Sequence, residues 1–148
     1  MSASLHLCTA EDIDVLLPLV TAYHNYAGHS GTDTERRAAL MPLLQGTPHG
    51  VAYLIGPRKA PVGYIVISFG YSVEFGGIDG LIDEFFIRSG VRGRGMGSEV
   101  LASLLPALSE HGVKALHLKV TTESRANRLF ARAGFRPRDG YHLMTRVF

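Results

Sequence analysis

Three β-type segments in the middle of the chain limit the fold more than any other feature. Residues 51–55, 62–71 and 81–88 are rich in β-branched and aromatic side chains, as strands are. Glycine and proline mark turns between them, at residues 56–61 and 74–80. Connections this short join antiparallel neighbours. The chain therefore needs a largely antiparallel sheet at its centre.

Helical periodicity surrounds this block. Ile13, Leu16, Leu17 and Val20 recur at helical spacing after a capping-box pattern that begins at Thr9, and Pro18 is expected to kink or divide that helix. The full predicted order is strand 4–8, a helix from residue 9, helix 33–45, the three central strands, a helix from 97 to 112, strand 113–120, helix 124–133 and strand 141–148. This order predicts one α+β (mixed α/β) domain over residues 1–148, with helices flanking the sheet.

Composition excludes several classes of protein. Apolar residues make up 46% of the chain and charged residues 19%, which is typical of a globular protein and not of a disordered one. We find no secretory signal and no apolar run near the ~20 residues that span a bilayer, and a single cysteine excludes an internal disulfide, so we expect a cytoplasmic protein. A net charge of +2 and scattered histidines indicate no nucleic acid, membrane or metal partner. The edge of the last predicted strand is compatible with a homodimer.

The chemistry is concentrated where the third central strand ends. A loop of alternating glycines and arginines follows it and leads into a helix: Arg92, Gly93, Arg94, Gly95, Met96, Gly97 and Ser98. Glycines let backbone N–H groups approach a ligand, and a helix N-terminus adds unpaired donors, so the loop predicts a phosphate site. It has no lysine, as a Walker loop requires, and Ser98 breaks the dinucleotide fingerprint. Arg92, Gly95 and Gly97 satisfy a third pattern, Arg-x-x-Gly-x-Gly/Ala.

On these residues, and on residues 123–135, the chain resembles the GCN5-related N-acetyltransferase (GNAT) superfamily. In appearance it is nearest to diamine acetyltransferase-like and bacterial histone-acetyltransferase-like members. The resemblance implies a GNAT-like twisted sheet and acetyl-coenzyme A (acetyl-CoA) as co-substrate, with its pyrophosphate on the loop. It also implies that backbone groups of Phe85, Phe86 and Ile87 bind the pantetheine arm and that a backbone N–H near Phe86 or Ile87 stabilises the oxyanion.

The chain departs from the family pattern at its last helix. Glu123 replaces the usual asparagine, and Phe130 replaces the tyrosine that often protonates the departing thiolate. Phe130 is expected to keep a stacking role beside the coenzyme. Tyr141 is the candidate replacement proton donor.

Acetyl transfer to an amine requires loss of a proton from a group with a pKa of about 10.4. Asp83 and Glu84 are the candidate general bases, and strand alternation lets only one of them face the site unless a bulge intervenes. Transfer is expected to be direct, because Cys8 is better explained as a buried structural thiol than as an acetyl carrier. The acceptor side is predicted to include Tyr23, Tyr26, His29, Tyr71 and Glu74.

The sequence thus predicts an acetyl-CoA-dependent N-acetyltransferase acting on a primary amine of a small molecule or a protein. The alternative is a catalytically weak acetyl-CoA-binding sensor or regulatory module, which Glu123 and Phe130 favour.

Overall fold

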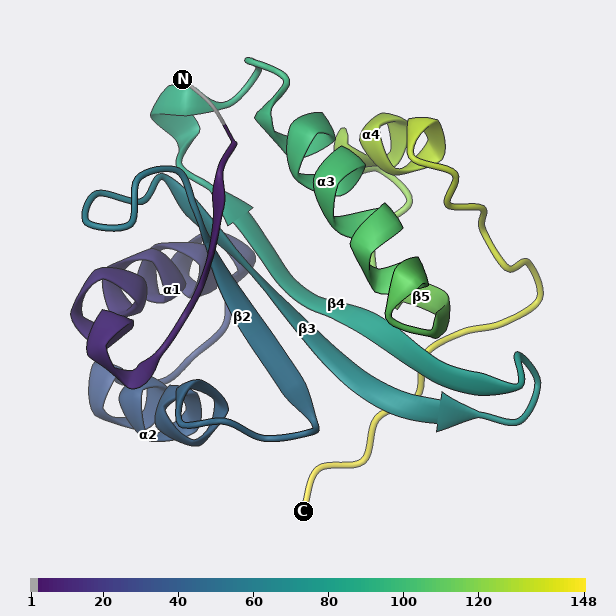
Figure 1. Ribbon diagram of the computed structural model, residues 1–148, viewed down its shortest axis with the longest axis horizontal. Helices are drawn as coiled ribbons and strands as arrows, with labels where there is room; N and C mark the ends of the chain where they lie inside the picture. Colours follow the sequence, from purple (N-terminus) through teal and green to yellow (C-terminus); the bar gives the residue numbers. More distant parts are fainter. Residues whose placement is uncertain (1–2) are drawn as a thin grey trace.

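The computed structural model describes residues 3–148 and contains the expected mixed sheet (Figure 1). Its strands lie side by side in chain order, and all neighbours are antiparallel except the last two, which are parallel. The strands are β1 (Leu5–Leu7), β2 (Gly50–Ile55), β3 (Gly63–Ser72), β4 (Gly77–Ile87) and β5 (Val113–Leu118). The predicted α+β class is confirmed.

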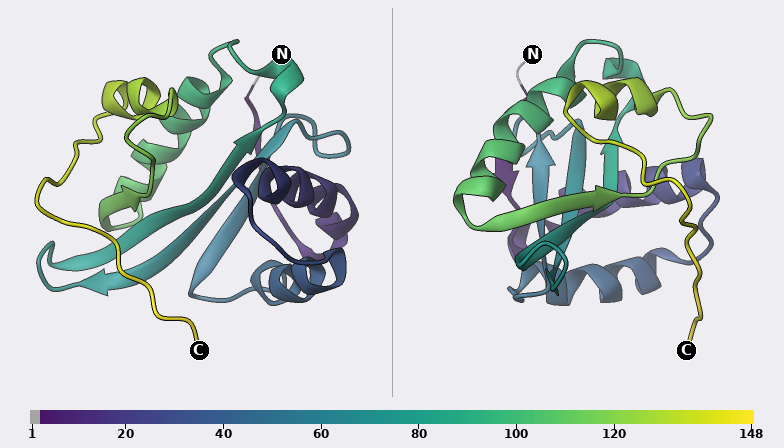
Figure 2. Two further views of the ribbon diagram at one scale, coloured as in Figure 1. Left: turned by 180° about the vertical axis from the view of Figure 1, so that it is seen from behind. Right: turned by 90° about the vertical axis from the view of Figure 1, so that its right-hand side faces the viewer.

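Helices cover both faces of this sheet (Figures 1 and 2). On one face lie α1 (Ile13–Ala27), which follows a short 3₁₀ turn at Ala10–Asp12, and α2 (Asp33–Leu44). On the other face lie α3 (Met96–Glu110), which follows a second 3₁₀ turn at Ser89–Val91, and α4 (Ala126–Arg132). The sheet is therefore the middle layer of three, and its central strands are covered on both sides.

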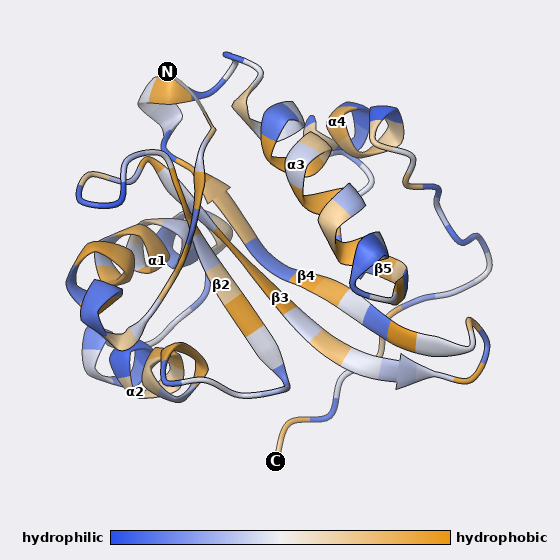
Figure 3. Ribbon diagram, viewed as in Figure 1, coloured by the Kyte–Doolittle hydropathy of each residue, from blue (hydrophilic) through white to orange (hydrophobic). Residues whose placement is uncertain are grey.

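The first part of β3 is apolar on both of its faces (Figure 3). Tyr64 and Val66 pack towards α1 and α2, whereas Ile65 and Ile67 pack towards α3. Each of these four side chains is buried. A strand covered on both faces is apolar at successive positions, which is the pattern that made this segment recognisable.

The first helix also follows local rules. Thr9 and Asp12 form the predicted capping box, in which the Thr9 backbone N–H donates to Asp12 Oδ2 at 2.8 Å. Pro18 does not divide α1, which runs uninterrupted from Ile13 to Ala27. The carbonyl that loses a hydrogen bond to Pro18 belongs to Asp14, and both residues are exposed, so water can take the place of the missing donor.

The strand predicted at residues 141–148 is wrong. Within residues 3–148 the sheet ends at β5, and this terminal segment runs past it as extended chain without a paired strand (Figure 2). Alternating apolar residues form a strand only where a neighbour supplies backbone partners. Five large apolar side chains here stay exposed: Tyr141, Leu143, Met144, Val147 and Phe148. The homodimer expected from that edge stays a prediction.

No helix in the described part of the chain is long and apolar enough to cross a membrane.

Candidate active site

A β-bulge in β4 brings the two candidate bases to the same side of the sheet. Val66 of β3 faces Glu84 and Ile67 faces Ile82, so Asp83 is an extra residue without a partner. A bulge of this kind interrupts strict alternation and redirects a side chain. The ionisable groups near enough to act on Asp83 electrostatically are Glu84, Lys119, His24 and His29. Both carboxyl groups therefore lie towards the end of α1.

Glu84 is held by a donor at each carboxylate oxygen. Tyr64 Oη donates to Glu84 Oε1 at 2.7 Å, and His24 Nε2 lies 2.7 Å from Glu84 Oε2. The side chains of His24 and Glu84 are each 18% exposed. Burial, followed by the charge of Glu84, raises the pKa of Tyr64, so this phenol remains a hydrogen-bond donor.

Behind His24 lies a buried arginine that the sequence analysis missed. Arg36 Nε donates to His24 Nδ1 at 3.2 Å, and Arg36 Nη1 donates to Asp33 Oδ1 at 2.9 Å. Arg36 occupies the same helical stripe as Leu40 and Leu44, four and eight residues later, and all three are buried. A charged residue on an apolar stripe is the sequence signal that could have identified it.

Asp83 has a different environment from its neighbour. Its carboxyl accepts no hydrogen bond from another side chain of residues 3–148, and the residue is exposed to solvent. Surrounding protein atoms nevertheless displace water from the carboxyl and raise its pKa, and the charge of Glu84 raises it further. Two neighbouring acids in unlike environments are suited to different chemical roles.

The glycine loop has the geometry of an anion site. Gly93 and Gly95 have φ of +79° and +74°, values in the left-handed region that other residues rarely adopt. Gly95 is the N-cap of α3 and no side chain caps it, so the first N–H groups of a 15-residue helix stay available. Met96 lies in the core at 3% exposure and anchors this turn, so only its backbone is left for a ligand.

Beside this loop, one edge of β4 is open. The pairing of β4 with β5 ends at Ile82 and Leu118, whereas β4 continues to Ile87. The N–H of Arg88 donates to Val62 O on the β3 side, so strand geometry turns the N–H groups of Phe85 and Ile87 towards the open edge. An extended ligand can pair with such an edge as a further strand would.

The comparisons with known proteins agree with this geometry. The sequence model of the Acetyltransferase (GNAT) family matches residues 16–135, which include the bulge, the open edge and the loop. The chain belongs to the GNAT acetyltransferase family. It is accordingly an N-acetyltransferase, and acetyl-CoA is the acetyl donor of its family. A comparison with curated proteins found no match.

Solved structures share the fold over nearly the whole chain. Integron cassette protein HFX_CASS3, from the mobile metagenome of Cole Harbour Salt Marsh, is 29% identical with a TM-score of 0.83, covering 97% of this chain and 89% of its own. A protein of Arthrobacter sp. FB24, described as an acetyltransferase, is 26% identical with a TM-score of 0.77; the match covers 98% of this chain and 94% of the Arthrobacter chain. A predicted acetyltransferase of Clostridium acetobutylicum, solved with acetyl-CoA, is 16% identical and shows the same fold with a TM-score of 0.76. The match covers 96% of this chain and 95% of the Clostridium chain.

In this GNAT domain, Arg92 connects the loop to the predicted acceptor side. Its Nε donates to Ile87 O at 2.7 Å, and its guanidinium carbon lies 5.0 Å from the ring centre of Tyr26 and 5.3 Å from that of Phe86. Tyr23 lies against Phe86 and His29. Tyr23, Tyr26 and His29 thus lie on the side of the sheet that carries Glu84, and their part in binding the acceptor stays a prediction.

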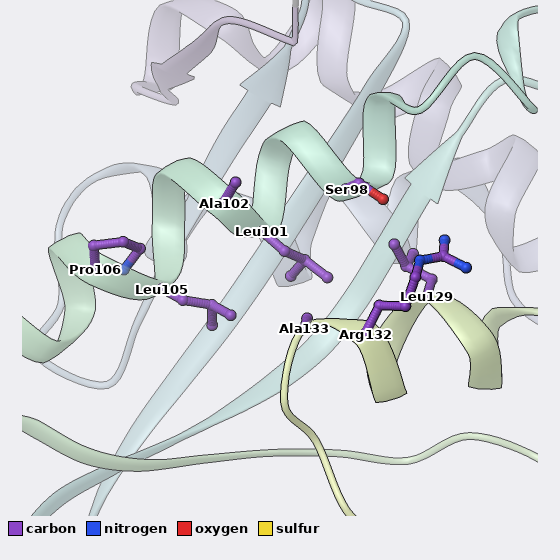
Figure 4. A pocket seen from close by; sticks show the side chains of 8 residues that line it. All are labelled: Ser98, Leu101, Ala102, Leu105, Pro106, Leu129, Arg132 and Ala133. Carbon is purple, nitrogen blue, oxygen red and sulfur yellow. The ribbon is translucent and has the colours of Figure 1, made fainter.

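Phe130 and Gly97 lie where α4 approaches the rest of the GNAT domain. The ring centre of Phe130 is 6.4 Å from that of Phe85, on the face of the sheet that α3 covers. A Cβ on Gly97 would lie 3.0 Å from Leu129 Cδ2, so Gly97 also permits close packing of α3 on α4. Between these helices runs a mainly apolar groove of about 440 Å³ (Figure 4), lined by Ser98, Leu101, Ala102, Leu105, Pro106, Leu129, Arg132 and Ala133.

Three predicted site residues lie elsewhere. Tyr71 pairs with Ile78 near the β3–β4 turn, five positions beyond Val66, which is roughly 17 Å along a strand at 3.4 Å per residue. Glu74 in that turn forms an ion pair of 2.8 Å with Arg138, whose guanidinium lies 5.2 Å from the ring centre of Tyr141. Tyr71, Glu74 and Tyr141 therefore lie at or near the β3–β4 turn, which is at the far end of these strands from the loop before α3 (Figure 1).

Proposed function

We propose that this enzyme transfers an acetyl group from acetyl-CoA directly to a primary amine of a small molecule or a protein, in a ternary complex. The observation that carries the proposal is the bulged Asp83–Glu84 pair, which interrupts β4 where its free edge begins and four residues before the strand ends. A carboxyl that can accept a proton thus lies on the strand that leads into an anion site.

The described residues fit acetyl-CoA along its length. The free N–H groups at the start of α3, together with Arg94, suit the two phosphates of its pyrophosphate. The open edge of β4 offers Phe85 and Ile87 to the amide groups of the pantetheine arm, and Phe130 packs beside Phe85. Bound there, acetyl-CoA supplies an acetyl group activated as a thioester.

In this proposal Asp83 is the general base. Its raised pKa brings its basicity closer to neutral pH, and its carboxyl has no competing side-chain donor. Glu84 is already hydrogen-bonded through both oxygens, so it attracts the cationic amine without accepting its proton. The two candidate bases expected from the sequence, Asp83 and Glu84, thereby take different roles: Asp83 is the base and Glu84 is its charged neighbour.

Acetyl transfer would then proceed through the following proton transfers and bond changes. Asp83 takes one proton from the ammonium group, and the nitrogen lone pair forms a bond to the thioester carbon. A backbone N–H at the open edge of β4 stabilises the negative charge that develops on the carbonyl oxygen. The C–S bond breaks as the carbonyl re-forms, the nitrogen loses its second proton to water, and water protonates the thiolate. A thiol has a pKa near 8.5, so its thiolate needs no dedicated acid, and Phe130 need not be replaced by Tyr141.

The acceptor would bind between the end of α1 and β4. Tyr23, Tyr26 and His29 present aromatic surface there, and Tyr26 is 73% exposed. Aromatic faces and carboxylates both attract a cationic amine.

The test is a panel of primary amines and amine-bearing peptides incubated with acetyl-CoA. Release of free thiol is followed together with the mass of each amine, and the Asp83→Asn variant is the matched control. Acetylation of at least one amine, reduced in the variant, is expected. Tight acetyl-CoA binding without an acetylated product from any amine would overturn the proposal in favour of a sensor module.

A further inference from the structure

Arg36 is a buried cation for which the proposed acetyl transfer has no direct use. The residue is 8% exposed and lies in α2, on the side of the sheet that carries the candidate bases. A buried charge is strongly unfavourable unless it is paired and hydrogen-bonded. Asp33 neutralises one end of the guanidinium and itself accepts a hydrogen bond of 2.7 Å from Thr21. The Nε–H of Arg36 is aimed at His24.

This contact determines which nitrogen of His24 carries a hydrogen. An arginine side chain remains protonated and can only donate, so His24 Nδ1 must accept through its lone pair. In a neutral imidazole the hydrogen is then on Nε2, the atom 2.7 Å from Glu84 Oε2. The direction of every hydrogen bond from Arg36 to Glu84 follows from the chemistry of the arginine.

We infer that Arg36 and His24 are positioning residues of the acetyl-transfer site: Arg36 holds His24 as its Nε2–H tautomer, and His24 with Tyr64 holds Glu84 as the charged neighbour of Asp83. The inference rests on the proposed function for its consequence in catalysis. The tautomer of His24, in contrast, is a property of the folded chain alone.

Loss of the Arg36 donor would change the electrostatics around Asp83. His24 could then carry a hydrogen on Nδ1, which turns an Nε2 lone pair towards the Glu84 carboxylate, or on both nitrogens, which adds a positive charge. That charge would favour the ionised form of Asp83. The titratable and charged groups around Asp83 and Glu84 come from several packed elements. Some act on the two acids directly: Tyr23, His24, His29, Tyr64 and Lys119. Others act through a neighbour: Tyr26 through Tyr23, and Arg36 with Asp33 through His24.

Two substitutions of Arg36 separate its hydrogen bond from its charge. Arg36→Gln places an amide nitrogen at the position of Nε, so it can still donate to His24 Nδ1. Arg36→Met has similar length and no donor. The tautomer of His24 is read in the full-length chain from the ¹⁵N shifts and ring couplings of its imidazole, and kcat/KM for an accepted amine is measured against pH.

We expect the unmodified chain and Arg36→Gln to show the Nε2–H form. Arg36→Met should show a mixture of the two His24 tautomers. Its kcat/KM should fall about tenfold, less than the ~10²-fold that misplacement of a reacting group can cost. The acidic limb of its pH profile of kcat/KM should move to lower pH. A residue with a merely structural role would lower the rate without changing the pH at which kcat/KM begins to fall.

Two outcomes distinguish the inference from the proposed function. An unchanged Nε2–H signal in folded Arg36→Met would overturn the inference, whatever its activity. Absence of acetyl transfer by the unmodified chain, with the expected tautomer pattern, would refute the proposed function and leave the control of His24 by Arg36 supported.

Discussion

Tyr64 donates a hydrogen bond of 2.7 Å to Glu84 across the β3–β4 pair, at a point where both strands are covered by α1. Asp83, the residue before Glu84, has no comparable donor among residues 3–148, and its pKa is raised by burial and then by the charge of Glu84. Adjacent acids in one bulge therefore differ in their hydrogen bonding, and this difference can be measured.

Replacement of the two acids should separate their roles through the pH dependence of kcat/KM. A base acts in its ionised form, so the rate should fall as pH drops through the raised pKa of Asp83. Asp83→Asn should lose this acidic limb and about 10²-fold in turnover at neutral pH. Glu84→Gln should keep the limb and move it to lower pH, because a neighbouring negative charge is gone. A limb that persists in Asp83→Asn would show that the base is elsewhere.

The same raised pKa predicts an effect on stability. The folded chain binds the Asp83 proton more tightly than the unfolded chain does, so its contribution to folding is lost as pH rises through the folded pKa. Asp83→Asn should therefore unfold at a higher temperature than the unmodified chain at neutral pH, and the gain should shrink below pH 4. Thermal unfolding at several pH values checks this, and a constant difference would contradict it.

Replacement of Gly95 should weaken acetyl-CoA binding in addition to straining the turn. Gly95 and Gly76 have nearly equal φ, +74° and +73°, and a Cβ on either meets nothing within 4 Å. Alanine at each site should therefore cost a similar ~1–2 kcal/mol of backbone strain. Only Gly95→Ala should weaken acetyl-CoA binding, by about tenfold or ~1.4 kcal/mol, because its methyl group occupies the side from which a phosphate approaches. Calorimetric titration and thermal unfolding of both variants provide the comparison; equal affinities would remove the loop from the binding site.

Phe130 should contribute through packing more than through chemistry. Its ring lies 6.4 Å from Phe85 and 5.7 Å from Phe135, centre to centre. Phe130→Tyr should raise turnover by less than about tenfold, below the ~10²-fold scale of a well-placed general acid. Phe130→Ala should reduce turnover by more than the tyrosine raises it. Steady-state rates on one accepted amine test both, and a gain of several hundredfold in Phe130→Tyr would mean that the natural chain lacks an acid it needs.

Cys8 should take no part in acetyl transfer. It is 6% exposed, and burial, with the charge of Asp12 adding to it, raises the pKa of its thiol to about 12. Reaction with iodoacetamide at pH 8 should therefore be very slow in the folded chain and fast once the chain is unfolded in denaturant. Cys8→Ala should retain turnover on an accepted amine. An acetylated Cys8 detected by mass spectrometry during turnover would contradict direct transfer.

Much of this enzyme could be predicted from the sequence because the relevant signals are local. The antiparallel centre follows from short turns between β-rich segments, and the uncapped glycine loop, the predicted anion site, follows from glycines placed directly before a helix. Such features depend on residues within one turn or loop of each other. The terminal segment at residues 141–148 shows the limit of this reasoning, since its alternating pattern has no partner strand in the described chain.

Only the tertiary structure decided how the two acids are placed and hydrogen-bonded. Strand alternation predicts opposite directions for Asp83 and Glu84, and the bulge that places them together depends on the register with β3. Arg36, His24, Tyr64 and Glu84 are distant in sequence, and they meet because the apolar faces of α1 and α2 pack on the same side of the sheet. Sequence spacing thus determined the glycine loop in which a phosphate site is predicted, whereas long-range packing determined which of the two carboxylates is hydrogen-bonded and which is not.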